Sequence, residues 1–352
     1  MLEWLSEKIG AGAAPPKEMT IAMLIRAYRT RPESPFKQVK FNTAKTYSYT
    51  MDLIERAAGD VKLASVNLGV LQRFYNDARY PEGVGADKPD RLRTAHGIVA
   101  MLRRLFSFGV AAEIEGCERI DRILSKTRFE APGRRASAMT AEQAAAFIAK
   151  ARDLGRTSLA IGQAIQFECA MRQRDVIGEW EPIGIDGPTS TFVLNGRQWV
   201  NGVTWSDISK DWILTKRTTK TGTVVSWDLR LCPLAFDLLS AIPADDRFGP
   251  VVIDETGGRP YAEHAYAREW RAVADAAGIP RDVFNMDARA GAATEADEAG
   301  AALDDMRPAM GHSDAKTTAR YVRGQSLEQS RRVATLRVAH RSGTSCGTRN
   351  WQ

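Results

Sequence analysis

The sequence predicts a two-domain protein that is mainly α-helical and has a small antiparallel β-sheet in its second domain, an α+β architecture. Its 352 residues are enough for two domains that each bury a core. Apolar residues recur at helical intervals through most of the chain. Residues 191–231 instead combine β-branched and aromatic residues with glycine-containing turns, a pattern typical of paired strands.

The N-terminal part predicts an all-α domain. From Thr20 to about Lys126, apolar residues spaced three or four positions apart indicate several short helices. After an N-terminal extension, residues 1–16, we expect this domain to cover residues 17–129. Residues 130–138 are rich in small and basic residues and include a Pro-Gly pair, which indicates an extended linker.

The second domain is expected over residues 139–340, followed by a C-terminal tail, residues 341–352. Its first helix has a capping-box pattern, because Gln143 follows Thr140 by three positions. A small antiparallel sheet follows, and then helices return to beyond Tyr321. The expected strand turns are Asn195-Gly196, Asn201-Gly202 and Thr221-Gly222.

Composition excludes several classes of protein. The chain is 44% hydrophobic and 26% charged, and no apolar stretch approaches the roughly 18 residues that a membrane span requires. Residues 1–10 carry acids early and have no export-signal layout, so we expect a cytoplasmic protein with no membrane partner. The four cysteines lack C-x-x-C spacing, which argues against a zinc site or a disulfide scaffold and favours reduced thiols.

Positive charge gathers in the N-terminal part. The net charge is +6, and residues 1–135 contain 23 Lys and Arg against 16 Asp and Glu. Such an excess suits contact with phosphates, although many basic segments are simply solvated. Lys45, Arg103 and Arg104 are candidate contacts with a nucleic-acid backbone, and a solvated helix face explains them equally well.

Five residues in the second domain form an ordered series. Tyr321 follows Gly311-His312 by nine positions, with a Thr-Thr pair between them. In chain order the five residues are Arg172, Lys220, Arg289, His312 and Tyr321. Each of the first three lies in a short motif: residues 168–175 around Arg172, Thr-Lys-Thr-Gly around Lys220 and residues 287–294 around Arg289. In this order and these contexts, the five residues resemble the signature of the tyrosine recombinase, or phage integrase, family.

This resemblance implies a two-domain architecture that clamps DNA, with a core-binding domain before the catalytic domain. It implies site-specific cleavage and rejoining of strands, for integration or excision of a mobile element. The implied partners are double-stranded DNA with a specific recombination site and three further copies of the chain, as a homo-tetramer. No metal or nucleotide cofactor is implied, and the expected setting is the nucleoid of a bacterial or phage-infected cell.

The chemistry of phosphodiester cleavage explains this residue set. Arg172 and Arg289 would clamp the charged phosphate oxygens in the transition state. His312 would donate a further hydrogen bond to the same phosphate. Tyr321 would be the nucleophile and hold the DNA through a 3′-phosphotyrosyl bond. Lys220 would protonate the leaving 5′-oxygen as general acid.

Two assignments leave alternatives open. Lys216 lies four positions before Lys220 and is a rival general acid. Asp175 follows Arg172 by three positions, so it is either a brace for that arginine or half of an ordinary solvated ion pair.

The chain departs from the family pattern at two places. A histidine usually stands three residues before the second arginine, and here that position is Met286, which cannot take a proton. Residues 181–204 are an extra segment to which we assign no function. The tail with Arg331, Arg332 and Arg337 has helical spacing, and packs either on a neighbouring protomer or on its own domain.

Two other functions compete with recombination. A type IB topoisomerase-like enzyme would use the same covalent chemistry without a defined partner site. A DNA-binding protein of the same fold, catalytically weakened, would account for Met286 but has no need of the whole catalytic set.

Overall fold

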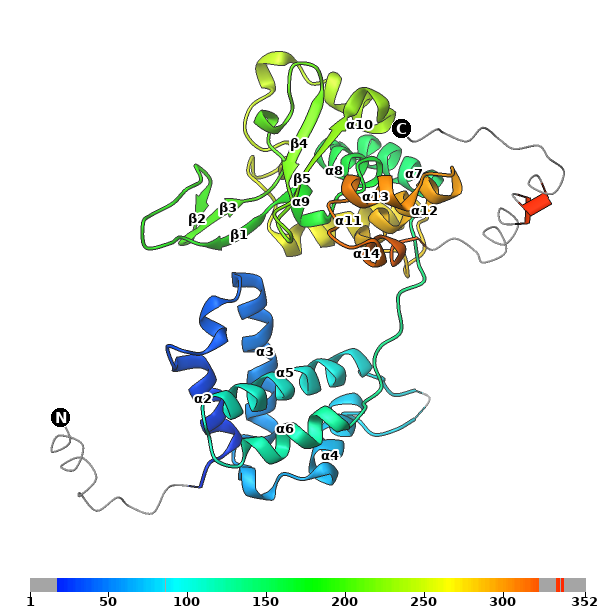
Figure 1. Ribbon diagram of the computed structural model, residues 1–352. Helices are drawn as coiled ribbons and strands as arrows, with labels where there is room; N and C mark the ends of the chain where they lie inside the picture. Colours follow the sequence, from blue (N-terminus) through cyan, green and yellow to red (C-terminus); the bar gives the residue numbers. More distant parts are fainter. Residues whose placement is uncertain (1–17, 86, 323–333, 336, 339–352) are drawn as a thin grey trace, which may run out of the picture. The chain divides into compact units, whose positions relative to one another are not determined.

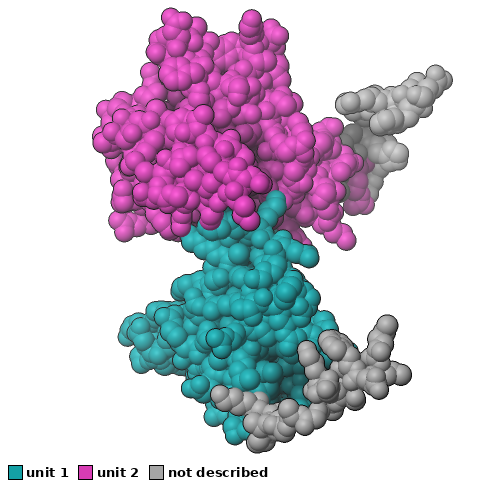
Figure 2. Space-filling view, turned by 90° about the vertical axis from the view of Figure 1, so that its left-hand side faces the viewer, with its two compact units in different colours: residues 1–134 teal, residues 135–352 magenta. Residues whose placement is uncertain are grey.

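The computed structural model describes residues 18–85, 87–322, 334–335 and 337–338. The chain forms two compact units, residues 1–134 and residues 135–352 (Figures 1 and 2). The division falls inside the stretch expected to be a linker. Each unit has its own buried hydrophobic cluster, so each is described by itself.

Unit 1 is built of helices in its described part. The longest, α5, packs against α3, α4 and α6 (Figure 1). A Cβ on Gly109 of α5 would lie 2.3 Å from the sulfur of Cys117, so α5 and α6 approach too closely there for any larger residue. The helices are α2 (Ile21–Thr30), α3 (Phe41–Ala58), α4 (Leu68–Arg79), α5 (Leu92–Ala111) and α6 (Cys117–Lys126).

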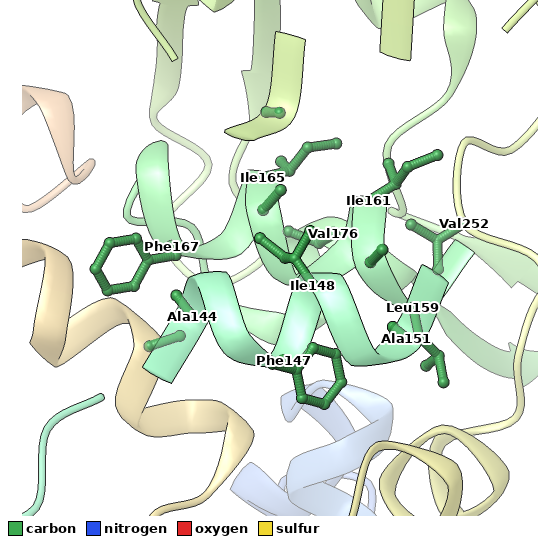
Figure 3. Packing of buried hydrophobic residues seen from close by; sticks show 14 of the residues in the cluster. Ala144, Phe147, Ile148, Ala151, Leu159, Ile161, Ile165, Phe167, Val176 and Val252 are labelled. Atoms are coloured by element: carbon green, nitrogen blue, oxygen red, sulfur yellow. The ribbon is translucent and has the colours of Figure 1, made fainter. Parts of the chain in front are cut away.

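Unit 2 packs its helices around α8, which is buried along nearly its whole length. Figure 3 shows Ile148 of α7 beside Ile161 and Ile165 of α8. The predicted capping box starts α7, because the N–H groups of Thr140 and Gln143 each donate to the other's side chain. The helices are α7 (Ala141–Asp153), α8 (Thr157–Glu168), α9 (Gln173–Ile177), α10 (Pro233–Ser240), α11 (Glu263–Ala276), α12 (Ala288–Glu298), α13 (Leu303–Ala309) and α14 (Ala315–Ala319).

The described strands of unit 2 form two antiparallel sheets rather than the single sheet expected over residues 191–231. One contains β1 (Glu179–Pro182), β2 (Val193–Leu194) and β3 (Arg197–Val200) in the order β1-β3-β2. The other pairs β4 (Ile213–Arg217) with β5 (Val224–Asp228). The first sheet takes most of its strand residues from the extra segment 181–204 and begins at Glu179, before the stretch in which strands were expected.

The β1-β3-β2 sheet is fixed to α9 by Trp199. The indole Nε1 of Trp199 donates to the carbonyl of Ile177 at 2.9 Å. Gly178 makes room for the ring, since a Cβ there would lie 2.2 Å from that nitrogen, and its φ of 76° also favours glycine. The extra sheet is thus packed against the helix that follows Arg172.

Two further findings bear on the sequence predictions. No helix in the described part of the chain is both long and apolar enough to span a membrane. The predicted C-terminal helix falls mostly outside the described residues, and so do Arg331 and Arg332.

Candidate active site

Arg172 lies in the turn between α8 and α9. The chain bends sharply there, because Ala170 takes a φ of 46°. Arg172 is the N-terminal capping residue of α9, and its side chain is only 18% exposed. Its Nη1 lies 3.6 Å from the carboxylate of Asp175. The turn therefore holds a partly buried guanidinium at a defined place on unit 2.

Arg289 is buried in the first turn of α12, with 3% of its surface exposed. It donates from Nη1 to the carbonyl of Ala170 at 2.6 Å and from Nη2 to that of Met310 at 2.6 Å. Burial lowers its pKa to about 10, and the positive charge of Arg172 adds to this. At neutral pH Arg289 remains charged, so the site contains two neighbouring guanidinium ions.

His312 follows α13, which ends at Ala309, and Gly311 before it takes a φ of 63°. Its Nε2 is 2.7 Å from Nη2 of Arg289, and its Nδ1 is 3.0 Å from the hydroxyl of Thr318. A guanidinium has no acceptor, so Nε2 must be the unprotonated nitrogen and Nδ1 carries the hydrogen. In this tautomer Nε2 accepts from Arg289, and a hydrogen bond from His312 to a phosphate stays a prediction.

Electrostatics keep His312 neutral. Burial, followed by the charges of Arg289, Arg172 and Lys220, lowers its pKa to about 4. The imidazole is 5% exposed. It is therefore uncharged at neutral pH, with a lone pair on Nε2.

Tyr321 stands against this cluster, two residues beyond α14. Its ring stacks on the imidazole of His312 with centroids 5.2 Å apart and 21° between the planes. The guanidinium carbon of Arg289 lies 5.1 Å from the Tyr321 ring centroid.

Lys220 belongs to the turn between β4 and β5, and its side chain is exposed. The turn is tied to the site at two points: the N–H of Thr219 donates to Asp175 at 2.7 Å, and the hydroxyl of Thr221 donates to the carbonyl of Gly311 at 3.2 Å. Lys220 is also among the charges that lower the pKa of His312. These contacts place the turn beside the other four residues.

Lys216, the rival candidate for general acid, forms hydrogen bonds within the fold. Its Nζ donates to the carbonyl of Gly202 at 2.5 Å and to Asp207 at 2.9 Å. The residue is only 9% exposed. These bonds tie β4 to the preceding loop, whereas Lys220 is exposed at the turn.

Asp175 is 1% exposed, which excludes the solvated ion pair. One of its oxygens accepts from Thr219, and the other faces Arg172 at 3.6 Å. It therefore connects the arginine turn to the lysine turn.

The position of the family histidine holds no titratable group. Met286 is 61% exposed in a short 3₁₀ turn. Its neighbours are engaged in structure, since Asn285 donates to Gln163 at 3.2 Å and Asp287 pairs with Arg135 at 2.6 Å. None of these side chains replaces the missing base.

Two buried guanidinium nitrogens point to an anion as the missing partner. Nη1 of Arg172 and Nε of Arg289 have no hydrogen-bond partner among the described residues. Buried donors are almost always satisfied, and an unsatisfied pair in a site calls for an explanation. A phosphate, with its several acceptor oxygens, fits both donors.

The three basic candidates of unit 1 differ in their surroundings. Arg103 donates to the carbonyls of Leu124 and Thr127, the latter at 2.9 Å, and thus ties α5 to the end of α6. Lys45 on α3 is exposed. Arg104 is exposed and stacks over the ring of Tyr47 at 4.9 Å. The structure gives Arg103 a structural role, and contact with DNA stays a prediction for all three residues.

The sequence did not assign a role to Thr318, although the Thr-Thr pair was part of the motif. Thr318 is fully buried, and its hydroxyl fixes the imidazole of His312. Thr219 and Thr221 were missed as well. Their roles depend on contacts with residues 44 and 90 positions away.

No protein-family model matches the chain, and no curated protein matches it. Solved structures do. A lambda integrase dimer bound to a COC′ core site matches with a TM-score of 0.64 and 16% identity, over 91% of this chain and 84% of that one. The Tn1549 transposon integrase in complex with transposon right end DNA matches with a TM-score of 0.63 and 14% identity, over 91% of this chain and 100% of that one. The resemblance to tyrosine recombinases therefore extends to the fold.

Proposed function

We propose that the protein is a site-specific tyrosine recombinase that cleaves and rejoins double-stranded DNA through a 3′-phosphotyrosyl bond to Tyr321. The observation that carries the proposal is the contact of Arg289 and His312 with Tyr321, together with the nearby charge of Arg172 and two guanidinium nitrogens that have no hydrogen-bond partner. Acceptor oxygens of one phosphodiester would satisfy both.

The reaction follows from the roles of these groups. The Tyr321 oxygen attacks phosphorus, and the P–O bond to the 5′-oxygen breaks. Arg172 and Arg289 stabilise the extra negative charge on the non-bridging oxygens, an effect that is commonly worth about 3–4 kcal/mol per donor. Lys220 gives a proton to the departing 5′-oxygen. Because the phosphotyrosyl bond preserves the energy of the diester, a 5′-hydroxyl of another strand can reverse the step on new DNA.

The fold suggests the partners. The similar structures include a lambda integrase dimer on a core site and a lambda integrase tetramer bound to a Holliday junction. By analogy, this chain would act as a tetramer on two copies of a specific site, for integration or excision of a mobile element. We place this activity in the cytoplasm, on the nucleoid.

The alternative is a DNA-binding protein of this fold that no longer cleaves. The observation that favours it is Met286, which puts an exposed thioether where a base is expected. A type IB topoisomerase-like enzyme is the third candidate. It would relax supercoiled plasmid of any sequence, whereas a recombinase needs its site.

Covalent trapping separates these candidates. Nicked DNA fragments from the flanks of the gene would be incubated with the wild type and with the Tyr321→Phe variant, and adducts that survive denaturing electrophoresis would be sought. The proposal predicts an adduct with the wild type and none with the variant. DNA binding by both proteins without an adduct from either would favour the binding protein.

A further inference from the structure

The turn that carries Lys220 is closed by its own backbone. The N–H of Thr218 donates to the carbonyl of Thr223 at 2.8 Å, and the N–H of Gly222 donates to the carbonyl of Thr218 at 2.9 Å. Gly222 takes a φ of 71°, a conformation that favours glycine. The residues from Thr218 to Thr223 therefore form a defined turn with Lys220 in its middle.

Three threonine hydroxyls on this turn are hydrogen-bonded to one another. The hydroxyl oxygen of Thr221 lies 2.8 Å from that of Thr218 and 3.1 Å from that of Thr223. Thr221 gives its single hydrogen to the carbonyl of Gly311 at 3.2 Å, so Thr218 and Thr223 must both donate to Thr221. The two donating hydroxyls polarise the bond from Thr221 to Gly311 and strengthen it.

The β4–β5 hairpin also packs directly on Gly311. A Cβ added to Gly311 would lie 3.2 Å from Cγ2 of Thr218 and 3.2 Å from Cγ1 of Val225, and both of these side chains are buried. The hydroxyl of Thr221 therefore reaches the Gly311 carbonyl at a packed junction between the hairpin and the loop that holds His312.

Lys220 thus lies between two anchored neighbours. On one side, the N–H of Thr219 donates to Asp175 at 2.7 Å, in the turn that carries the first arginine. On the other side, the hydroxyl of Thr221 donates to the carbonyl of Gly311. Fixing both neighbours limits the positions from which the exposed Lys220 side chain can extend.

We infer that Thr221 is a positioning residue for the general acid, because its hydroxyl holds the turn against Gly311 and so keeps the Lys220 ammonium within reach of the leaving 5′-oxygen. This inference rests on the proposed function. In the step, the electron pair of the breaking P–O bond takes the proton and becomes the O–H bond at the 5′-oxygen. The pair of the broken N–H bond stays on the Lys220 nitrogen. Thr221 takes no part in these bond changes and acts through Lys220.

The test uses two nicked DNA substrates that differ in their need for a proton. In one the leaving atom is the ordinary 5′-oxygen, and in the other it is sulfur, which leaves as a thiolate. With the oxygen substrate, Thr221→Val should slow adduct formation about 10-fold, the scale of one or two hydrogen bonds. With the sulfur substrate the loss should largely disappear, because the reaction no longer depends on where Lys220 lies.

Thr215→Val is the matched control. Thr215 shares a hydroxyl hydrogen bond with Ser226 at 3.0 Å on the same hairpin, but this bond joins β4 to β5 rather than the turn to Gly311. The control should keep the wild-type rate on both substrates. Thr221→Ser retains the hydroxyl and should recover most of the rate that Thr221→Val loses.

An equal loss in Thr221→Val on both substrates would overturn the inference, because a defect in folding or in DNA binding does not depend on the leaving atom. A wild-type rate for Thr221→Val on the oxygen substrate would also overturn it, and so would an equal loss in Thr215→Val. Absence of any adduct from the wild type on both substrates would instead overturn the proposed function itself.

Discussion

The carboxylate of Asp175 accepts a hydrogen bond from the backbone N–H of Thr219 at 2.7 Å. Its second oxygen lies 3.6 Å from Arg172, and the residue is 1% exposed. One buried side chain therefore joins the turn that carries the first arginine to the turn that carries Lys220, although 44 residues separate the two.

Removing this connection should slow cleavage without abolishing DNA binding. Asp175→Ala frees the lysine turn and leaves Arg172 without its counter-ion, and misplacement of catalytic groups by about 1 Å costs on the order of 100-fold in rate. Asp175→Asn keeps an acceptor for Thr219 and should lose less. Single-turnover adduct formation measures both. Equal rates for Asp175→Ala and the wild type would show that the connection is dispensable.

Lys220 and Lys216 should respond differently to substitution. Lys220→Ala should lower the cleavage rate by about 10²–10⁴-fold, the usual worth of a general acid. A DNA substrate with sulfur in place of the leaving 5′-oxygen should restore the rate, since a thiolate leaves without a proton. Lys216→Ala should instead lower the free energy of unfolding by about 1–3 kcal/mol, because Asp207 loses its counter-ion and the carbonyl of Gly202 loses its donor. If the sulfur substrate restored the rate of Lys216→Ala and did not restore that of Lys220→Ala, the general acid would be Lys216.

The extra sheet should depend on Gly178. Gly178→Ala places a Cβ 2.2 Å from the Trp199 indole at a φ of 76°, and should lower the free energy of unfolding by about 2 kcal/mol or more. Gly187→Ala is the matched control, since Gly187 also has a positive φ but no atom within 4 Å of the added Cβ. Chemical denaturation compares the two. Equal losses would mean that backbone strain, and not the contact with Trp199, is responsible.

Stability should depend on pH through His312. Its pKa in the folded protein is about 4, below the ordinary value of 6.5, so the unfolded chain binds the proton more readily. The contribution of His312 is therefore fully present above about pH 6.5 and is lost as pH falls toward 4. Thermal unfolding between pH 7 and pH 4 should show a smaller decline for His312→Gln than for the wild type. Parallel declines would show that other groups account for acid sensitivity.

Met286→His should speed cleavage. The exposed methionine stands where a base is expected, and an imidazole there could accept the Tyr321 proton. The comparison is the adduct rate of the variant against that of the wild type. No gain would indicate that position 286 is too far from the nucleophile in this chain.

Local patterns in the sequence predicted several features of this structure. The capping box of Thr140 and Gln143, the turn at Asn195-Gly196 and the helical domain at the N-terminus all depend on residues close in sequence. The order of the motifs alone was enough to propose the residues of the candidate site.

What the sequence could not provide depends on contacts between distant segments. The strands divide into two sheets and Trp199 docks on α9, and alternation reveals neither. The tautomer of His312 depends on Arg289, 23 positions away, and the choice of Lys220 over Lys216 depends on Asp207. Each requires the folded chain to bring the partners together.

The measurement that tests the central claim most directly is identification of the residue that carries the DNA. The trapped adduct would be digested with trypsin and nuclease, and the modified peptide identified by mass spectrometry. We predict a phosphotyrosyl group on the tryptic peptide that consists of residues 321–323, which follows Arg320. DNA attached to any other residue would contradict the account, and so would an adduct that persists in Tyr321→Phe.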